Sequence, residues 1–395
     1  MSSTLKPESA GQLHDIVKWA AGEEKPLDIL GLGTKQAIGR PAQHEFTLDL
    51  CALTGVTLYE PEELVLSARS ATPRAEVEKL LRDKNQEFAF EPPDLSALLG
   101  ASGAGTLGGM IGANLAGPRR IKAGAVRDHF LGFSGVSGRG ETFKSGGRVV
   151  KNVTGYDLPK IIAGSWGTLA VLSDVTLKVL PAAETEMSFA VEGLSDENAV
   201  EAMSRALQSS CEVSGAAHLP EGLLGAAATV FRLEGIGPSV EYRLEKLAGL
   251  LKEAGPSEKM DADASRELWR SIRDVSFFAN GSDRPVWRLS VPPMDGAKVA
   301  AAIGAKCDAR WFFDWAGGLI WCEVPEAENA SEQIVRGAVA RTSGHATLIR
   351  APQAIRAAVD VFQPPEPGLA LIAQNIKAAF DPKGILNPGR MYATA

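Results

Sequence analysis

The order of hydrophobic and polar positions in the first part of the chain predicts short strands mixed with amphipathic helices. Apolar residues recur at helical spacing over 9–25, and Pro26 marks the end of that helix. The run Leu27–Leu30 has the length and composition of a short buried strand, and a glycine-rich turn follows it directly. The same reasoning predicts a helix over 74–84 and strands over 47–50, 57–60, 64–71 and 168–180.

After a linker at 181–183 the pattern changes to strands that alternate with amphipathic helices. We expect strands over 187–192, 227–233 and 287–291, helices over 196–209, 238–254 and 295–304, and a hairpin over 311–324. This pattern predicts an α+β module built on an antiparallel sheet. A helix over 367–379 follows near the end of the chain. No internal repeat of fixed period is visible.

Length, charge and cysteine content narrow the possible classes of protein. A chain of 395 residues exceeds what one hydrophobic core usually supports, so two domains are expected. The net charge of −7 argues against nucleic acid as a partner, and no apolar run is long enough to span a membrane. The first residues lack the apolar core of a signal peptide, which predicts a cytoplasmic protein. No metal site is expected, because the cysteines lie far apart at Cys51, Cys211, Cys307 and Cys322.

The first glycine-rich turn has the composition of a phosphate-binding loop. A diphosphate must be met at close range by backbone N–H groups, and glycine allows that approach because it has no Cβ and tolerates positive φ. The segment Gly31-Leu32-Gly33-Thr34 follows the predicted strand and adds a hydroxyl group. An ordinary turn between two strands would explain this segment equally well.

A second loop, residues 103–109, matches the dinucleotide-binding pattern G-x-G-x-x-G. That pattern needs a buried strand directly before it and an acidic residue at the end of the next strand. Here Pro92-Pro93-Asp94 and a short helical stretch precede the loop, and Asp128 comes before the next strand. The sequence context therefore argues against a Rossmann fold.

The order of several motifs resembles the FAD domain of the vanillyl-alcohol oxidase superfamily, the PCMH-type FAD-linked oxidases. Both glycine loops contribute, followed by the stretches NLAGPR at 114–119, GAVRD at 124–128, KNVTGYDL at 151–158 and GSWGTL at 164–169. The ending Phe380–Arg390 is similar to the usual C-terminus of that superfamily. Within it, three further stretches resemble the family of FAD-binding E subunits of bacterial glycolate oxidase (glycolate dehydrogenase): WRLSVP at 287–292, DWAGG at 314–318 and GHATL at 344–348.

The resemblance implies an α+β fold with a two-lobed PCMH-type FAD-binding domain over 1–182 and an antiparallel-sheet cap domain over 183–345. A C-terminal segment, 346–395, would return to complete the FAD site. The attachment is expected to be non-covalent, since Lys35-Gln36 stand where members with covalent flavin often carry a histidine. The residues that the resemblance assigns to the cofactor are Gly31, Leu32, Gly33, Thr34, Lys35, Gln36, Gly105, Thr106, Leu107, Gly108, Gly109, Asn114, Arg127, Asp128, Gly164, Gly167, Thr168, Leu169, Val171, Asn387 and Arg390.

Oxidation of a 2-hydroxy acid also needs a cation for the carboxylate and a base for the hydroxyl proton. Arg288 and His345 are the candidates, because Arg288 shares a strand face with Ser290 and because His345 has Arg350 nearby. A surface salt bridge would explain Arg288 equally well, and a lone histidine is more often structural than catalytic.

Three hypotheses remain open. The chain is an FAD subunit that relays electrons within a glycolate oxidase complex, a self-sufficient 2-hydroxy-acid dehydrogenase that uses Arg288 and His345, or a scaffold whose FAD is structural. The absence of a dense histidine cluster favours the first. The resemblance then implies a catalytic flavoprotein subunit and an iron–sulfur subunit as partners, in the cytoplasm or at the inner face of the membrane, and glyoxylate as the product.

Overall fold

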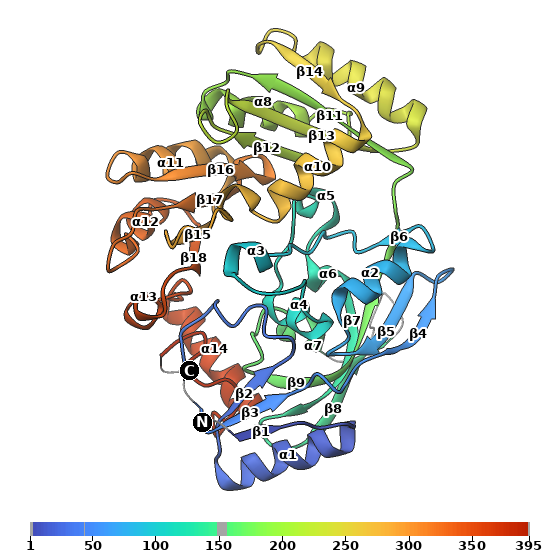
Figure 1. Ribbon diagram of the computed structural model, residues 1–395, viewed down its shortest axis with the longest axis vertical. Coiled ribbons are helices and arrows are strands. Elements are labelled where there is room, and N and C mark those ends of the chain that lie inside the picture. The colour runs from blue at the N-terminus through green and yellow to red at the C-terminus, as the bar shows by residue number, and fades with distance from the viewer. Residues whose placement is uncertain (1–2, 43, 148–155, 394–395) are drawn as a thin grey trace.

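A computed structural model of the chain describes residues 3–42, 44–147 and 156–393 (Figure 1). The N-terminal part forms two lobes, and a second region with a large sheet lies above them in the view of Figure 1. The C-terminal segment, drawn in red, lies beside the blue strands of the N-terminus. Residues 151–155 of the predicted motif at 151–158 lie outside the described residues.

The first lobe is a parallel sheet of three strands covered by one helix. The strand order is β1-β3-β2, and α1 packs on the sheet because Leu13, Val17 and Ala20 recur on one face and are fully buried. The helix begins after Ser9, whose side chain accepts a hydrogen bond from the Gln12 backbone N–H at 3.2 Å. The elements of this lobe are β1 (Ser3–Leu5), α1 (Ala10–Glu23), β2 (Leu27–Leu30) and β3 (Phe46–Asp49).

The second lobe is an antiparallel sheet of five strands in the order β4-β5-β9-β7-β8, with short helices around it. A two-stranded ribbon of β6 and β10 lies beside it. The strands are β4 (Val56–Glu60), β5 (Val65–Arg69), β6 (Gln86–Glu87), β7 (Phe130–Ser137), β8 (Thr142–Gly146), β9 (Ala170–Lys178) and β10 (Leu180–Pro181). The helices are α2 (Arg74–Arg82), α3 (Ser96–Leu99), α4 (Leu107–Ala113), α5 (Arg120–Ala123), α6 (Val126–His129) and α7 (Leu158–Ile162).

The cap region contains one antiparallel sheet of eight strands in the order β14-β11-β13-β12-β16-β17-β15-β18. Its first half is β11 (Thr185–Glu192), α8 (Asp196–Leu207), β12 (Gly215–Leu219), β13 (Ala228–Gly235), α9 (Gly237–Leu251) and β14 (Ser257–Met260). Its second half is β15 (Val286–Ser290), α11 (Gly296–Gly304), β16 (Arg310–Asp314), β17 (Leu319–Glu323), α12 (Glu332–Val339) and β18 (His345–Arg350). The helix α10 (Ala262–Arg273) joins the halves.

The two halves of the cap have the same β-α-β-β-α-β connectivity, and they meet where β12 pairs with β16. The sequence shows no repeat of fixed period, so this duplication of topology is a finding of the structure. The predicted hairpin over 311–324 is present as β16 and β17. In the cap, the five helices and strands that the periodicity did not predict are β12, β14, β18, α10 and α12. The expected cap boundary at 345 falls on the first residue of β18, so the sheet itself continues to Arg350.

A buried ion cluster joins the cap to the N-terminal part. Glu91 accepts hydrogen bonds from Arg232 at 2.8 and 2.7 Å and from the backbone N–H of Arg119 at 2.8 Å. Arg119 also forms ion pairs with Glu87 at 2.7 Å and with Glu234 at 2.6 Å. Since Glu87, Glu91 and Arg119 precede the cap and the other two residues lie on β13, this cluster fixes the cap against the second lobe.

The C-terminal segment, with α13 (Gln353–Ala358) and α14 (Pro367–Phe380), returns to the first lobe. Asp381 is buried and accepts hydrogen bonds from the backbone N–H groups of Ile385 and Leu386, at 3.0 and 2.8 Å. That turn places Leu386 in a bridge beside Leu27 at the start of β2. The predicted α+β fold class is confirmed. Within the described ranges, no helix combines the length and the apolar character that a membrane crossing requires.

Candidate functional site

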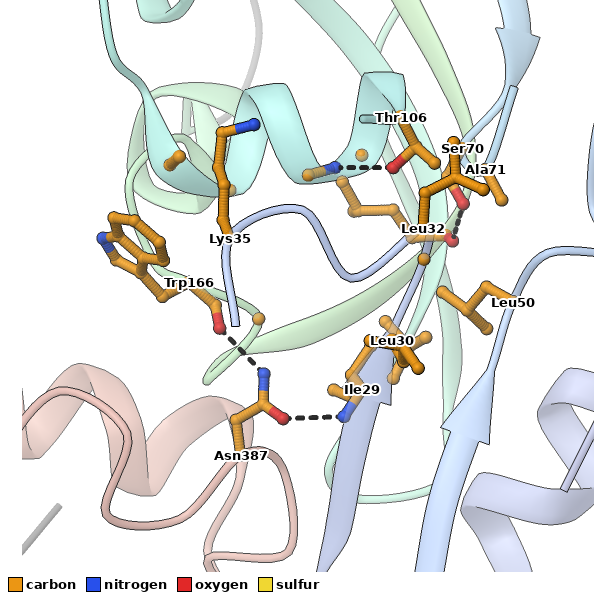
Figure 2. A pocket seen from close by; sticks show the side chains of 18 of the residues that line it. Ile29, Leu30, Leu32, Lys35, Leu50, Ser70, Ala71, Thr106, Trp166 and Asn387 are labelled. Atoms are coloured by element: carbon orange, nitrogen blue, oxygen red, sulfur yellow. Dashed lines mark hydrogen bonds between the residues drawn. The ribbon is translucent and has the colours of Figure 1, made fainter. Parts of the chain in front are cut away.

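A pocket of about 890 Å³, continuous with solvent, lies where β2, the second glycine loop and the C-terminal segment meet (Figure 2). The first loop, residues 31–36, forms one wall, and Gly108 and Gly109 in the first turn of α4 form another. Thr106 caps α4, because its Oγ1 accepts a hydrogen bond from the Gly109 backbone N–H at 3.1 Å. This hydrogen bond at the start of α4 holds the second loop in place opposite the first.

The two glycine loops approach so closely that only glycine fits at their contact. A Cβ on Gly105 would lie 2.7 Å from Thr34 Oγ1 and 3.4 Å from Lys35 Nζ, and Gly105 has a φ of +85°. A Cβ on Gly31 would lie 2.9 Å from the Thr106 hydroxyl. The close approach and the positive φ are what a loop needs when its backbone must surround a phosphate.

The pocket offers hydrogen-bond donors that no protein group uses. Across the described chain, the backbone N–H groups of residues 31–35 donate no hydrogen bond, and the Lys35 ammonium has neither a hydrogen bond nor an ion pair. Burial, and then the charge of Arg74, lower the pKa of Lys35 to about 8. A row of free N–H groups beside an unpaired ammonium binds anions.

The C-terminal segment closes the pocket on the side of the first loop. Asn387 Oδ1 accepts from the Ile29 backbone N–H at 2.7 Å, and its Nδ2 donates to the Trp166 carbonyl at 2.8 Å (Figure 2). Arg390 Nη2 donates to the Lys35 carbonyl at 3.0 Å, and the guanidinium lies over the Trp166 ring, 5.6 Å from its centroid. Arg390 Nε is buried and has no partner among the described residues.

A second cavity, of about 1250 Å³ including space continuous with solvent, lies between the N-terminal part and the second half of the cap sheet. Ala113 and Trp166 line both cavities, so the two adjoin each other. On the sheet side, Arg288 of β15 lies opposite Thr347 of β18, and Ser290 lies opposite His345. The alternation along β15 therefore places these four side chains on the cavity side, and Arg288 and Ser290 share one face of the strand, as the sequence predicted. All four line the cavity.

Positive charge dominates the second cavity. Burial, and then the neighbouring charge of Arg120, lower the pKa of Arg288 to about 10. Burial and the charges of Arg288 and Arg120 also lower the pKa of His345, which keeps its imidazole neutral near pH 7. Asp314 is fully buried, and burial raises its pKa to about 7, so it compensates only part of this charge. The Arg288 guanidinium forms no ion pair or hydrogen bond with any described residue.

The structure brings most of the predicted cofactor residues to these two cavities. The residues that line the first pocket are Gly31, Leu32, Gly33, Thr34, Lys35, Gln36, Thr106, Gly108, Gly109, Gly167, Val171, Asn387 and Arg390. Asn114 and Gly164 line the second cavity. Gly105 stands directly behind Thr34 and Lys35.

Five predicted cofactor residues line neither cavity, and each has a structural role. Leu107 and Leu169 are buried in the core of the second lobe. Arg127 is exposed and donates to the Lys160 carbonyl at 3.0 Å, while Asp128 accepts from the Ala125 backbone N–H at 2.8 Å. Thr168 donates to the Ser165 carbonyl at 2.7 Å. For these five, contact with the cofactor stays a prediction, and the structure shows that motif residues also hold the loops in shape.

Sequence reasoning missed several lining residues because their partners come from distant segments. Trp166 lies between the two glycines of GSWGTL and lines both cavities, so its motif carried a signal. For Trp315 the sequence favoured a place in the core of the cap over a place at a cavity, whereas the structure sets its indole ring beside two arginines, each 5.0 Å from the ring centroid. The remaining missed residues of the first pocket are Ile29, Leu30, Leu50, Ser70, Ala71, Gly112, Ala113, Ile162, Ser165, Ala170 and Leu172.

The comparisons with known proteins agree with this geometry. A family model described as an FAD binding domain matches residues 2–146. The glycolate oxidase subunit GlcE of Escherichia coli (strain K12) is 32% identical over 96% of this chain and 97% of its own length. The glycolate oxidase subunit GlcD of Bacillus subtilis (strain 168) is 25% identical over 99% of this chain and 89% of its own length. A solved structure of alkyldihydroxyacetonephosphate synthase shares the fold, with a TM-score of 0.70 and 14% identity over 98% of this chain and 75% of that chain.

Fold, pocket and family model together define an FAD-binding protein of the FAD-linked oxidoreductases. More narrowly, the chain belongs to the family of the glycolate oxidase subunit GlcE, and the resemblance that the motifs indicated is confirmed. The residues present fit the cofactor. The free N–H groups of residues 31–35 and the Lys35 ammonium suit its diphosphate, and the close approach of Gly105 leaves the backbone accessible.

We predict that FAD affinity falls as the pH rises above about 8. A bound diphosphate would raise the Lys35 pKa from about 8, so FAD binds best while this amine is protonated and loses affinity as the pH rises through that value. The Lys35→Met variant should bind FAD about tenfold more weakly or worse at pH 7, and its affinity should change little up to pH 9.5. Equilibrium titration with FAD at several pH values would measure this. A wild-type affinity that is constant from pH 7 to 9.5 would contradict the role of Lys35.

Proposed function

We propose that this chain is the FAD-binding subunit of a complex that oxidises glycolate, a 2-hydroxy acid, to glyoxylate, and that it relays electrons within that complex. The observation that carries the proposal is the pocket between the two glycine loops, with its free N–H groups and unpaired Lys35 ammonium. The relatives of this family, which are named as glycolate oxidase subunits, support the substrate.

The electrons need a route out of the chain. Within the described residues, no group of three or more His, Cys, Asp or Glu side chains is placed to hold a metal ion. The four cysteines are free and well separated in the sequence. We therefore propose a catalytic flavoprotein subunit and an iron–sulfur subunit as partners, in an assembly in the cytoplasm or at the inner face of the membrane.

We further propose that the FAD is held without a covalent bond. The first loop presents Lys35 and Gln36 to the pocket, and it contains no histidine. Denaturation with acid should release the flavin into the supernatant. Flavin that remains with the precipitated polypeptide would contradict this part of the proposal.

A second candidate function is oxidation of the 2-hydroxy acid by this chain itself, and the second cavity favours it. The unpaired Arg288 can bind a carboxylate through two parallel hydrogen bonds. His345, neutral near pH 7, can accept the proton of the substrate hydroxyl. When bound, FAD supplies the acceptor for the hydride. Arg288→Leu should then lower activity by about 2 to 4 kcal/mol of transition-state stabilisation.

Anaerobic titration of the isolated holoprotein with glycolate separates the two functions. For a relay subunit, we expect the flavin absorbance to remain that of the oxidised form, and we expect reduction only after the partner subunits are added. A control with dithionite establishes that the bound flavin can be reduced. Full glycolate turnover by this chain alone, with a dye as acceptor, would refute the relay role and establish the second candidate.

A further inference from the structure

Two consecutive arginines at the start of α5 lie in surroundings of different charge. Arg119 is surrounded by the carboxylates of Glu87 and Glu91 from the N-terminal part and of Glu234 from the first half of the cap. Arg120 faces the second cavity, and no described residue offers it a carboxylate or a hydrogen-bond acceptor. Arg119 is therefore neutralised by the protein, whereas Arg120 is not.

The same contrast appears on the cap side. Arg232 in the first half lies over the Trp269 ring, 4.8 Å from its centroid, and pairs with Glu91 at 2.7 Å. Arg288 in the second half lies over the Trp315 ring, 5.0 Å from its centroid, without any carboxylate partner. An arginine in each half of the cap thus lies over a tryptophan ring, but only the arginine of the first half has a carboxylate partner.

Arg120 and Arg288 share Trp315 as their neighbour. Each guanidinium carbon lies 5.0 Å from the centroid of the same indole ring, one coming from the N-terminal part and the other from the cap. The indole is held in place because its Nε1 donates to the Gly117 carbonyl at 3.0 Å. Two like charges beside one ring repel each other, so an anion bound near both would relieve this repulsion.

We propose that Arg120 is a second cation of the ligand site in this cavity and that, with Arg288, it holds the carboxylate of a small carboxylic acid between the N-terminal part and the cap. The cavity adjoins the pocket of the glycine loops, so the ligand lies beside the cofactor site. Asp314 does not serve as the counter-charge of the two arginines, because its carboxylate is buried and accepts a hydrogen bond from the Trp315 backbone N–H at 2.7 Å. A carboxylate from a ligand can therefore take that role. The identity of the acid as a 2-hydroxy acid rests on the proposed function, but the binding of its carboxylate does not.

The test is calorimetric titration of the full-length holoprotein with acetate and with glycolate. Arg120→Gln and Arg288→Gln should each weaken the binding of both acids about tenfold or more, since a charge-assisted pair is lost. Lys122→Gln is the matched control, because it also removes a cation from α5. The Lys122 ammonium pairs with Glu212 at 3.6 Å and does not line the cavity. The control should bind both acids like the wild type.

A double variant and a folding control complete the test. If both arginines hold one carboxylate, the Arg120→Gln/Arg288→Gln protein should lose less affinity than the two single losses multiplied together. FAD content and thermal melting should match the wild type in Arg120→Gln, whose side chain is exposed. Wild-type affinity for acetate in Arg120→Gln, or no measurable binding of acetate by the wild type, would overturn the proposal. Because acetate is not oxidised, these outcomes are independent of whether the chain relays electrons.

Discussion

Replacement of Gly105 with valine is expected to abolish FAD binding. A Cβ at this position would lie 2.7 Å from Thr34 Oγ1, and the added methyl groups would extend towards the Lys35 ammonium, 3.4 Å from that Cβ. The residue also has a φ of +85°, a conformation that costs a β-branched side chain about 1–3 kcal/mol. The two loops must therefore separate, and the N–H groups that surround the phosphates lose their positions.

The measurement is the ratio of flavin to protein after purification, with a titration of the remaining apoprotein. Gly281→Val is a matched control, because Gly281 has a φ of +76° but nothing within 4 Å of its Cβ position. This variant carries similar backbone strain far from the pocket, and it should retain FAD at the wild-type ratio. Normal FAD content in Gly105→Val would show that the contact between the loops does not form the cofactor site.

Neutralisation of Glu91 should give the largest loss of stability. Glu91→Gln leaves Arg232 fully buried and removes one of the carboxylates beside Arg119, and breaking a buried pair in this way costs about 3–5 kcal/mol. Unfolding in urea would measure the loss. Glu253→Gln is a suitable control, because this exposed carboxylate pairs with the exposed Lys252 at 3.4 Å and its removal should cost no more than about 1 kcal/mol.

The same carboxylate predicts a loss of stability in acid. Although burial opposes it, the charges of Arg232 and Arg119 lower the pKa of Glu91 to about 2, from its usual value of 4.5. The unfolded chain then binds a proton more readily, so this contribution is complete above about pH 4.5 and is lost as the pH falls towards 2. Glu91→Gln should lack this part of the pH dependence. Identical slopes of stability against pH in both proteins would contradict the assignment.

Much of the first pocket was predictable from local sequence. Short-range reasoning is enough to predict the strand Leu27–Leu30 and the loop Gly31-Leu32-Gly33-Thr34 that follows it. The glycines and the buried strand before them are properties of one segment of the chain. The order of the motifs then identified the family, which the similarity to GlcE confirms. The same method assigned Leu107 and Leu169 to the cofactor, whereas the structure buries both side chains in the core of the second lobe, because a motif does not distinguish a lining residue from one that packs behind it.

The sequence by itself determined the fold class, the family, the two glycine loops and the face of β15 that carries Arg288, since all of these follow from periodicity and from the order of motifs. Only the tertiary structure decided which arginines are free. Arg119 and Arg120 are neighbours in the chain, yet one is surrounded by carboxylates and the other faces a cavity. That difference depends on Glu234 and Trp315, more than a hundred residues away, because ion pairing is set by distance in space and not along the chain.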